Sequence, residues 1–105
     1  MPSGPRIPIP TDALRAFCTR WGVLEFALFG SVLRDDFGPE SDVDVMIEFL
    51  PGRGFTFENT PEIIDELRAL LGRRVDVVEK NRIQNPYRRA SMMAGRQVVY
   101  AQAAA

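Results

Sequence analysis

Segments typical of β-strands are interleaved with segments of helical period along the chain. Strand-like runs lie at residues 24–29, 43–49, 74–78 and 97–101. Helix-like segments lie at residues 12–20, 61–71 and 86–93. This interleaving predicts an α+β fold of α/β-like character, in which helices pack on a β-sheet. At 105 residues the chain is typical of one domain with its own hydrophobic core.

The two ends of the chain differ from the segments between them. Residues 1–10 include alternating isoleucine and proline, and proline holds both itself and the residue before it in extended conformations. We expect an extended arm there, a folded domain over residues 11–101, and an alanine-rich tail at residues 102–105 that frays. Thr11 is the expected N-cap of the first helix, and Gly22 follows its last turn.

The composition excludes several kinds of chemistry. The chain has one cysteine, Cys18, and no histidine, which excludes an internal disulfide, a Cys/His zinc site and a histidine base. Any metal site must therefore use oxygen ligands, and Cys18 is expected to fill the core. With 13 basic and 14 acidic residues the net charge is −1, which leaves no basic surplus for nucleic acid. Because there is no membrane-spanning apolar run and no signal-peptide pattern, we expect a soluble cytoplasmic protein.

Two carboxylates share one face of the predicted strand at 43–49. Side chains alternate along a strand, so Asp42 and Asp44 point to one side and the apolar residues between and after them to the other. Aspartate is depleted from strands and like charges repel, which a bound divalent cation would explain. Asp76, inside the next strand-like run, could complete an oxygen cage for Mg²⁺. The alternative is that both segments are edge strands with solvated acids.

A Gly-Ser pair ends the first apolar strand. Gly30 lets the backbone approach a phosphate, while exposed N–H groups and the Ser31 hydroxyl can donate hydrogen bonds to its oxygens. Arg34, one helical turn later, either neutralises triphosphate charge or pairs with Asp35 or Asp36. A lone Gly-Ser is typical of an ordinary turn. Followed after ten residues by Asp-x-Asp at the start of another strand, it indicates a site that brings phosphates and carboxylates together.

The stretch FGSVLRDDFGPESDVDVMIEF, followed by GRRVDVVE, resembles the minimal nucleotidyltransferases (MNT) of the DNA-polymerase-beta-like superfamily. The resemblance covers nearly the whole chain and implies the nucleotidyltransferase fold, a single mixed β-sheet with helices packed on it. It also implies that Gly30 and Ser31 hold the β- and γ-phosphates of ATP. In the same way, it implies that Asp42 and Asp44 bind Mg²⁺ and that Asp76 completes the metal site near the attacking hydroxyl.

Many MNT proteins accompany an all-helical HEPN ribonuclease and act as its antitoxin, some by adenylylating a tyrosine. The resemblance therefore implies a magnesium-dependent enzyme that transfers AMP from ATP to a tyrosine of a HEPN toxin, within a hetero-oligomer. We expect the acceptor to come from outside the chain, because little of it remains once the nucleotide site is built. Two alternatives stay open: a binding antitoxin with a vestigial nucleotide site, and a nucleotidyltransferase for a small hydroxyl compound such as an antibiotic.

Other residues carry weaker signals. Four apolar and aromatic residues are more typical of a core, yet they are the best candidates for partner contact: Met92, Met93, Tyr87 and Tyr100. Two arginine pairs, at 73–74 and 88–89, could touch an acidic partner or RNA but are more typical of a solvated surface. Glu48 and Glu79 are expected to be charges at the rim of the site.

Overall fold

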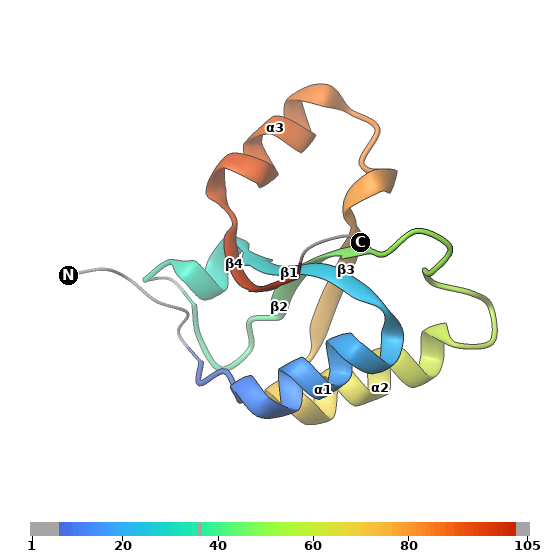
Figure 1. The fold of residues 1–105 in the computed structure, drawn as a ribbon. Coiled ribbons are helices and arrows are strands. Elements are labelled where there is room, and N and C mark those ends of the chain that lie inside the picture. Colours follow the sequence, from blue (N-terminus) through green and yellow to red (C-terminus); the bar gives the residue numbers. More distant parts are fainter. Residues whose placement is uncertain (1–6, 36, 103–105) are drawn as a thin grey trace.

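The computed structural model describes residues 7–35 and 37–102, which form a four-stranded sheet with helices on both faces (Figure 1). In Figure 1, α1 and α2 lie together below the sheet and α3 lies above it. The helices are α1 (Thr11–Trp21), α2 (Thr60–Leu71) and α3 (Pro86–Gly95), and the short 3₁₀ turns are η1 (Gly30–Leu33) and η2 (Lys80–Arg82). The strands are β1 (Val23–Phe29), β2 (Val43–Phe49), β3 (Val75–Glu79) and β4 (Gln97–Ala101).

The sheet has the strand order β3-β2-β1-β4 and contains both strand directions. β1 runs antiparallel to β2 and to β4, whereas β2 and β3 are parallel. A parallel pair needs a crossover that returns the chain to the same end of the sheet, and α2 supplies it. The mixed sheet with packed helices confirms the expected α+β fold. It also places the starts of β2 and β3 side by side.

The main core lies between the sheet and the helix pair α1 and α2. The β2 residues of one parity, Val43, Val45 and Ile47, are fully buried in it. Phe17 of α1 meets Phe26 of β1 edge to face, with ring centroids 6.1 Å apart. The apolar parity predicted for β2 is thus the face that the helix pair covers.

Cys18 lies in this core and has no exposed surface. Burial raises the pKa of its thiol to about 12, so the sulfur stays protonated at neutral pH. A buried, protonated thiol is a poor nucleophile. The expectation that Cys18 fills the core is confirmed.

A smaller apolar cluster lies on the opposite face of the sheet, beneath α3. Ala27 of β1, Met46 of β2 and Met92 of α3 are buried in it, and Val78 and Ile83 pack against it. The core interpretation of Met92 is therefore confirmed. The expectation that this face of β2 is acidic is wrong at Met46, because α3 folds back over the sheet and covers that side chain.

The start of α1 differs by one residue from the sequence expectation. The carbonyl of Pro10 accepts the first helical hydrogen bond, from the N–H of Leu14 at 2.8 Å, and no side chain caps this end. The N-cap is therefore Pro10, and the assignment of Thr11 as the cap is wrong. The fixed backbone of proline already sets the direction in which the chain enters the helix. Gly22, in the left-handed conformation, ends α1 as expected.

Of the expected arm and tail, residues 7–10 and 102 belong to the described part of the chain. Ile7 is buried against the main core. Gln102 donates its backbone N–H to the Leu24 carbonyl at 2.9 Å and its side-chain amide to the Val23 carbonyl at 2.7 Å. The chain is therefore held to β1 through residue 102. The remainder of the arm and of the tail lies outside the described residues.

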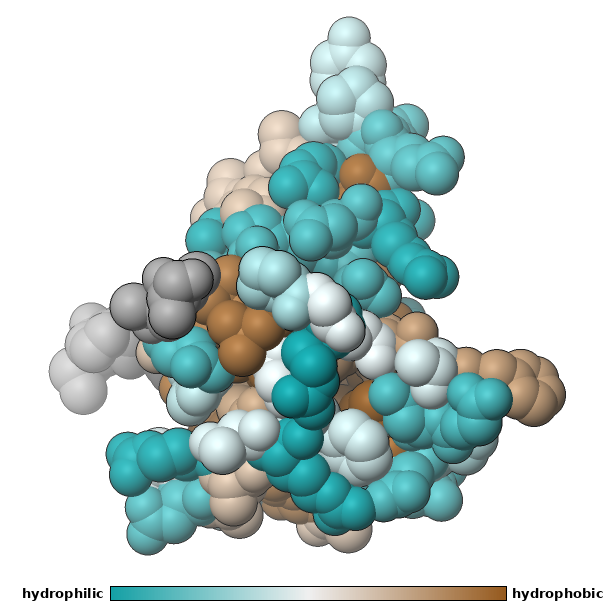
Figure 2. Space-filling model, turned by 45° about the vertical axis from the view of Figure 1, so that its right-hand side comes forward, coloured by the Kyte–Doolittle hydropathy of each residue, from teal (hydrophilic) through white to brown (hydrophobic). Residues whose placement is uncertain are grey.

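The face shown in Figure 2 is mostly hydrophilic, and hydrophobic atoms occupy separate small areas of it. Within residues 7–35 and 37–102, no helix combines the length and the apolar character needed to cross a membrane. The apolar side chains of the three helices are instead used in the two clusters on either face of the sheet.

Candidate active site

Asp44 and Asp76 lie side by side on neighbouring strands. They are paired in register across the parallel strands β2 and β3, so their Cα atoms are about 4.8 Å apart and their side chains share one face. This is the α3 face of the sheet, because Met46 and Val78 have the same parity as the two aspartates. Asp42 immediately precedes β2 and also has this parity. All three predicted carboxylates therefore start from the same face.

Gly30 lies against this group from the side of β1. It follows β1 directly as the first residue of η1, and the residue before it, Phe29, is paired with Asp44. Its φ of 75° is in the left-handed region, which glycine adopts without strain. A Cβ at this position would collide with the Asp44 carboxylate, whose Cγ would be only 3.2 Å away. The glycine therefore lets that carboxylate lie directly against the turn.

The surroundings of Asp44 disfavour its charged form. Burial raises the pKa of this carboxyl above its usual value, and the negative charges of Asp76 and Asp42 raise it further. Arg34 acts in the opposite direction and lowers it. The predicted site residues therefore interact electrostatically, and Arg34 is close enough to offset part of the repulsion. A bound cation would relieve the same repulsion.

An arginine pair holds the loop that leads to Asp42. Arg74 donates from Nε to Asp42 Oδ1 at 3.0 Å. Arg73 donates to the carbonyls of Gly38 and Ser41, at 2.6 and 2.8 Å. The pair at 73–74 ties the loop before β2 to the start of β3, while the Arg74 side chain remains 60% exposed, as expected for a solvated pair. The sequence could not indicate this role, since Arg74 and Asp42 are separated by 32 residues and meet only when β2 and β3 pair.

A pocket of about 480 Å³ opens between η1 and the C-terminal half of α3, and we call it the η1 pocket. Gly30 and Arg34 line it from one side, and Ser91 and Met92 line it from the other. Turn N–H groups and a guanidinium are the donors that a polyanion such as a triphosphate requires. The α3 residues of this pocket carry no motif, because they reach the site only through the packing of α3 over the sheet.

Ser31 is the second residue of η1 and is half-buried. Its carbonyl accepts the N–H of Arg34 at 2.8 Å, which closes the turn between them. The turn therefore presents Gly30, Ser31 and Arg34 within one short segment beside Asp44, as the motif predicts.

Two of the three predicted metal ligands, Asp44 and Asp76, are placed to hold a magnesium ion together. Within the described part of the chain, no group of three or more acidic, histidine or cysteine side chains is arranged to hold a metal ion. Asp44 and Asp76 are neighbours, whereas Asp42 is hydrogen bonded to Arg74. Mg²⁺ is commonly held by one or two carboxylates together with substrate phosphates and water. Asp44 and Asp76 fit that chemistry.

The two glutamates expected at the rim are both paired. Lys80 donates from Nζ to Glu48 Oε1 at 2.9 Å, and both side chains are largely buried. Glu79 forms an ion pair with Arg82 at 3.5 Å. These pairs connect the ends of β2 and β3 to η2.

A mixed sheet with aspartates at the starts of two parallel strands, and a Gly-Ser turn set against them, defines the class of the nucleotidyltransferases. Comparison with known families agrees, because residues 11–99 match the nucleotidyltransferase domain family. The chain belongs to this family.

Two relatives share most of the chain. MJ1379 of Methanocaldococcus jannaschii, named as a candidate protein adenylyltransferase, is 38% identical over 73 residues, which are 70% of this chain and 73% of that protein. The protein adenylyltransferase MntA of Thermococcus cleftensis is 33% identical over 87 residues, 77% of each chain.

Solved structures have the same fold. A candidate minimal nucleotidyltransferase aligns with a TM-score of 0.67 at 31% identity, over 83% of this chain and 86% of its own. A chain from a toxin–antitoxin complex with AMP-PNP gives 0.68 at 14% identity, over 90% and 75%. A chain from the complex of a tri-AMPylated Shewanella oneidensis HEPN toxin with its MNT antitoxin gives 0.59 at 15% identity, over 88% and 70%. The last two likenesses, at low identity, show the fold alone. The family match and the 31% identical candidate minimal nucleotidyltransferase confirm the resemblance to minimal nucleotidyltransferases.

Proposed function

We propose that this nucleotidyltransferase transfers AMP from ATP to a tyrosine hydroxyl of a HEPN-type toxin and acts as the antitoxin of that partner. One observation carries the proposal: a turn suited to phosphates, at Gly30, lies against carboxylates suited to a cation, Asp44 and Asp76. Relatives named as protein adenylyltransferases and fold neighbours from toxin–antitoxin complexes support a protein acceptor. We place the reaction in the cytoplasm, where ATP and Mg²⁺ are available, and in a hetero-oligomer with the toxin.

The chemistry is an in-line displacement at the α-phosphorus of ATP. The tyrosine oxygen forms a bond to phosphorus, the bond to the bridging oxygen of the β-phosphate breaks, and pyrophosphate leaves. Bound magnesium would supply charge stabilisation for the attacking and leaving oxygens. Gly30 and Ser31 hold the β- and γ-phosphates, and Arg34 offsets their charge. Asp76, exposed on the edge strand, accepts the proton of the tyrosine hydroxyl.

All three aspartates would be ligands of the cation. Asp44 and Asp76 offer neighbouring carboxylates from β2 and β3. Asp42 would contribute its second oxygen, since Oδ1 is occupied by the Nε–H of Arg74. Binding of the cation removes the repulsion that raises the pKa of Asp44 in the free protein.

Labelled ATP tests the proposal. The chain, a candidate HEPN partner and ATP labelled at the α-phosphate are incubated with Mg²⁺, and the products are analysed by mass spectrometry. We expect one or more AMP groups on tyrosine of the partner, and none after magnesium is removed with EDTA. Asp76→Ala should abolish labelling, whereas Asp65→Ala, at an exposed position of α2, should leave it intact. An unlabelled partner in the wild-type reaction contradicts the proposal.

A binding antitoxin with a vestigial site is the second candidate, and one observation favours it. In the described residues the carboxylates are not arranged as a complete three-ligand metal site. This candidate predicts that Asp42→Ala and Asp76→Ala still neutralise the toxin fully in cells. Loss of neutralisation by these variants, with the complex retained on size-exclusion chromatography, favours the enzymatic function instead.

A further inference from the structure

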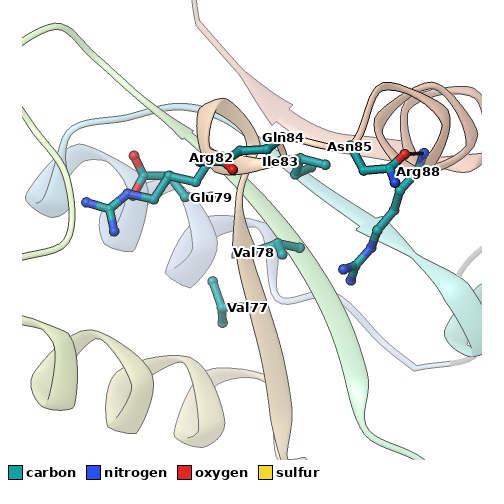
Figure 3. A pocket seen from close by; sticks show the side chains of 8 residues that line it. All are labelled: Val77, Val78, Glu79, Arg82, Ile83, Gln84, Asn85 and Arg88. Carbon is teal, nitrogen blue, oxygen red and sulfur yellow. Dashed lines mark hydrogen bonds and ion pairs between the residues drawn. The ribbon is translucent and has the colours of Figure 1, made fainter.

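A second pocket, of about 460 Å³, lies at the outer edge of β3 (Figure 3), and we call it the β3-edge pocket. Val77, Val78 and Ile83 give it apolar surface, and Arg82 and Arg88 reach it from η2 and α3. β3 is the end strand of the sheet, paired with β2 on one side, so its outer backbone groups are open to a further strand. The pocket therefore combines an open strand edge with apolar and cationic side chains.

The β3-edge pocket and the η1 pocket lie on opposite sides of the aspartates. In the strand order, β1 with its η1 turn lies on one side of Asp44, and β3 with Asp76 lies on the other. Asp76 precedes Val78 by two residues on the same face, about 7 Å along the strand. In-line displacement places the attacking and leaving oxygens on opposite sides of the phosphorus. With the nucleotide in the η1 pocket, the acceptor approaches from the side of β3.

Among the charged side chains of the β3-edge pocket, Arg88 has unused bonding capacity. Figure 3 shows the Arg88 side chain extending from α3 on the Val78 side of β3, and it makes no ion pair within the described residues. On the other side of the strand, Glu79 Oε1 is enclosed and lies 3.5 Å from Arg82 Nε, so it is not open to a docking segment. The pocket thus offers a cation to a carboxylate of a docking segment.

We propose that the β3-edge pocket docks the segment of the partner protein that carries the acceptor residue, as an extended stretch with an acidic side chain. The segment lies along the outer edge of β3, where its backbone pairs with the open strand edge, and its carboxylate meets Arg88. Its hydroxyl side chain then reaches Asp76. The inference rests on the proposed function and names the surface that selects the protein acceptor.

A peptide fits this pocket better than a nucleic acid does. Apolar surface and an open strand edge are features that bind extended peptides, through main-chain hydrogen bonds and side-chain pockets. Nucleic acid binding depends on a basic stripe that neutralises several phosphates. Here Arg82 is already paired with Glu79, and Asp76 lies two residues before Val78 on the same strand. One available guanidinium suits a single carboxylate.

The first test is the charge reversal Arg88→Glu, with AMP transfer to the partner measured at saturating ATP and Mg²⁺. We expect the KM for the partner to rise by roughly tenfold or more, with kcat little changed, because an attraction becomes a repulsion. The substitution should not unfold the protein, since a glutamate in the first turn of α3 is favourable for the helix dipole. Arg15→Glu, at an exposed position of α1, makes the same change in net charge and should leave the KM unchanged.

Reversal of the partner's charge completes this test. Replacing the acidic residue nearest the modified tyrosine with arginine should raise the KM of the wild-type enzyme and restore it for Arg88→Glu. An equal KM for Arg88→Glu and Arg15→Glu overturns the proposal. A rise in the KM of Arg88→Glu that no charge reversal in the partner restores also overturns the proposal.

Hydrogen exchange separates this proposal from the proposed function. In the complex of the wild-type chain with its partner, the amides of β3 (Val75–Glu79) should exchange more slowly than in the free chain, and Arg88→Glu should reduce that protection. This readout does not require AMP transfer, so docking can hold even where the enzymatic function fails. Unchanged exchange of β3 in the complex overturns docking while leaving AMP transfer standing. A single-stranded oligoribonucleotide that binds wild type but not Arg88→Glu, with partner KM unaffected, overturns it in favour of RNA.

Discussion

The negative charge of ionised Asp44 destabilises the folded protein. Burial and the charges of Asp76 and Asp42 raise the pKa of its carboxyl above the value in the unfolded chain. The folded state therefore binds a proton at Asp44 more tightly than the unfolded state does. By linkage, the free energy of unfolding falls as the pH rises from the unfolded pKa through the raised folded pKa. At neutral pH the ionised carboxylate lowers the stability of the ligand-free protein.

Asp44→Asn should therefore raise the Tm of the ligand-free protein at neutral pH. The gain should shrink as the pH falls through the raised pKa and vanish below the pKa of an unfolded aspartate, where the wild-type carboxyl is protonated. Thermal unfolding over a pH series measures this. Asp65→Asn, at an exposed position of α2, is the matched control and should show no comparable gain.

The same variant checks the nucleotide site. A ligand that binds the folded state raises its Tm, so ATP with Mg²⁺ should stabilise the wild type and the Asp65→Asn control. Asp44→Asn should lose most of this shift. An equal ligand-induced shift in Asp44→Asn would exclude Asp44 from the site.

Among the elements, α3 has a strong local signal at its start. The Asn85 side chain accepts hydrogen bonds from the N–H groups of Tyr87 and Arg88, at 2.9 and 3.0 Å, and Pro86 is the first helical residue. Asn85→Ala should lower the free energy of unfolding by about 1 kcal/mol, because these N–H groups lose their acceptor. Urea denaturation measures it. Asn81→Ala, exposed in η2, should change it by less than about 0.5 kcal/mol, and equal effects of both variants would contradict the capping role.

Local sequence signals were sufficient to predict the positions of most helices and strands. The strands expected at 43–49 and 97–101 have the same bounds in the structure, and α2 and β3 begin within one residue of the expected positions. Alternating parity in β2 and the proline and glycine signals around the helices are properties of short segments. Thr11 was predicted as the N-cap because threonine side chains favour that position. In the structure the fixed backbone of Pro10 sets the start of the helix, so Pro10 is the N-cap.

Less of the site than of the fold could be predicted from the sequence, because much of the site depends on contacts between distant segments. Parity alone placed Asp42 and Asp44 on one face. The register of Asp44 with Asp76 requires the pairing of β2 with β3, which only the family resemblance implied. The Arg74 bond to Asp42 requires the same pairing, and the Ser91 wall of the η1 pocket requires α3 to fold over the sheet. None of these contacts leaves a periodic pattern in the chain.

At the scale of the whole molecule, the two faces of the sheet differ in kind. The face under α1 and α2 holds the main core, including Leu14, Ile63 and Leu67, which are almost fully buried. The α3 face holds a small cluster and leaves room for the η1 pocket and the β3-edge pocket. The free energy of folding therefore comes largely from one face, and the other can carry repelling carboxylates.

Because Cys18 is buried, the rate at which a reagent labels this single thiol of the chain measures how often the main core opens. Its raised pKa of about 12 and its lack of exposed surface leave almost no reactive thiolate in the closed state. A thiol reagent at mildly alkaline pH should therefore label the folded protein only at the rate at which α1 separates from the sheet. The same reagent should label the chain unfolded in guanidinium immediately. Rapid labelling of the folded protein would contradict this. With slow labelling, comparing the rate with and without the proposed partner would measure how far partner binding restrains the opening of the main core.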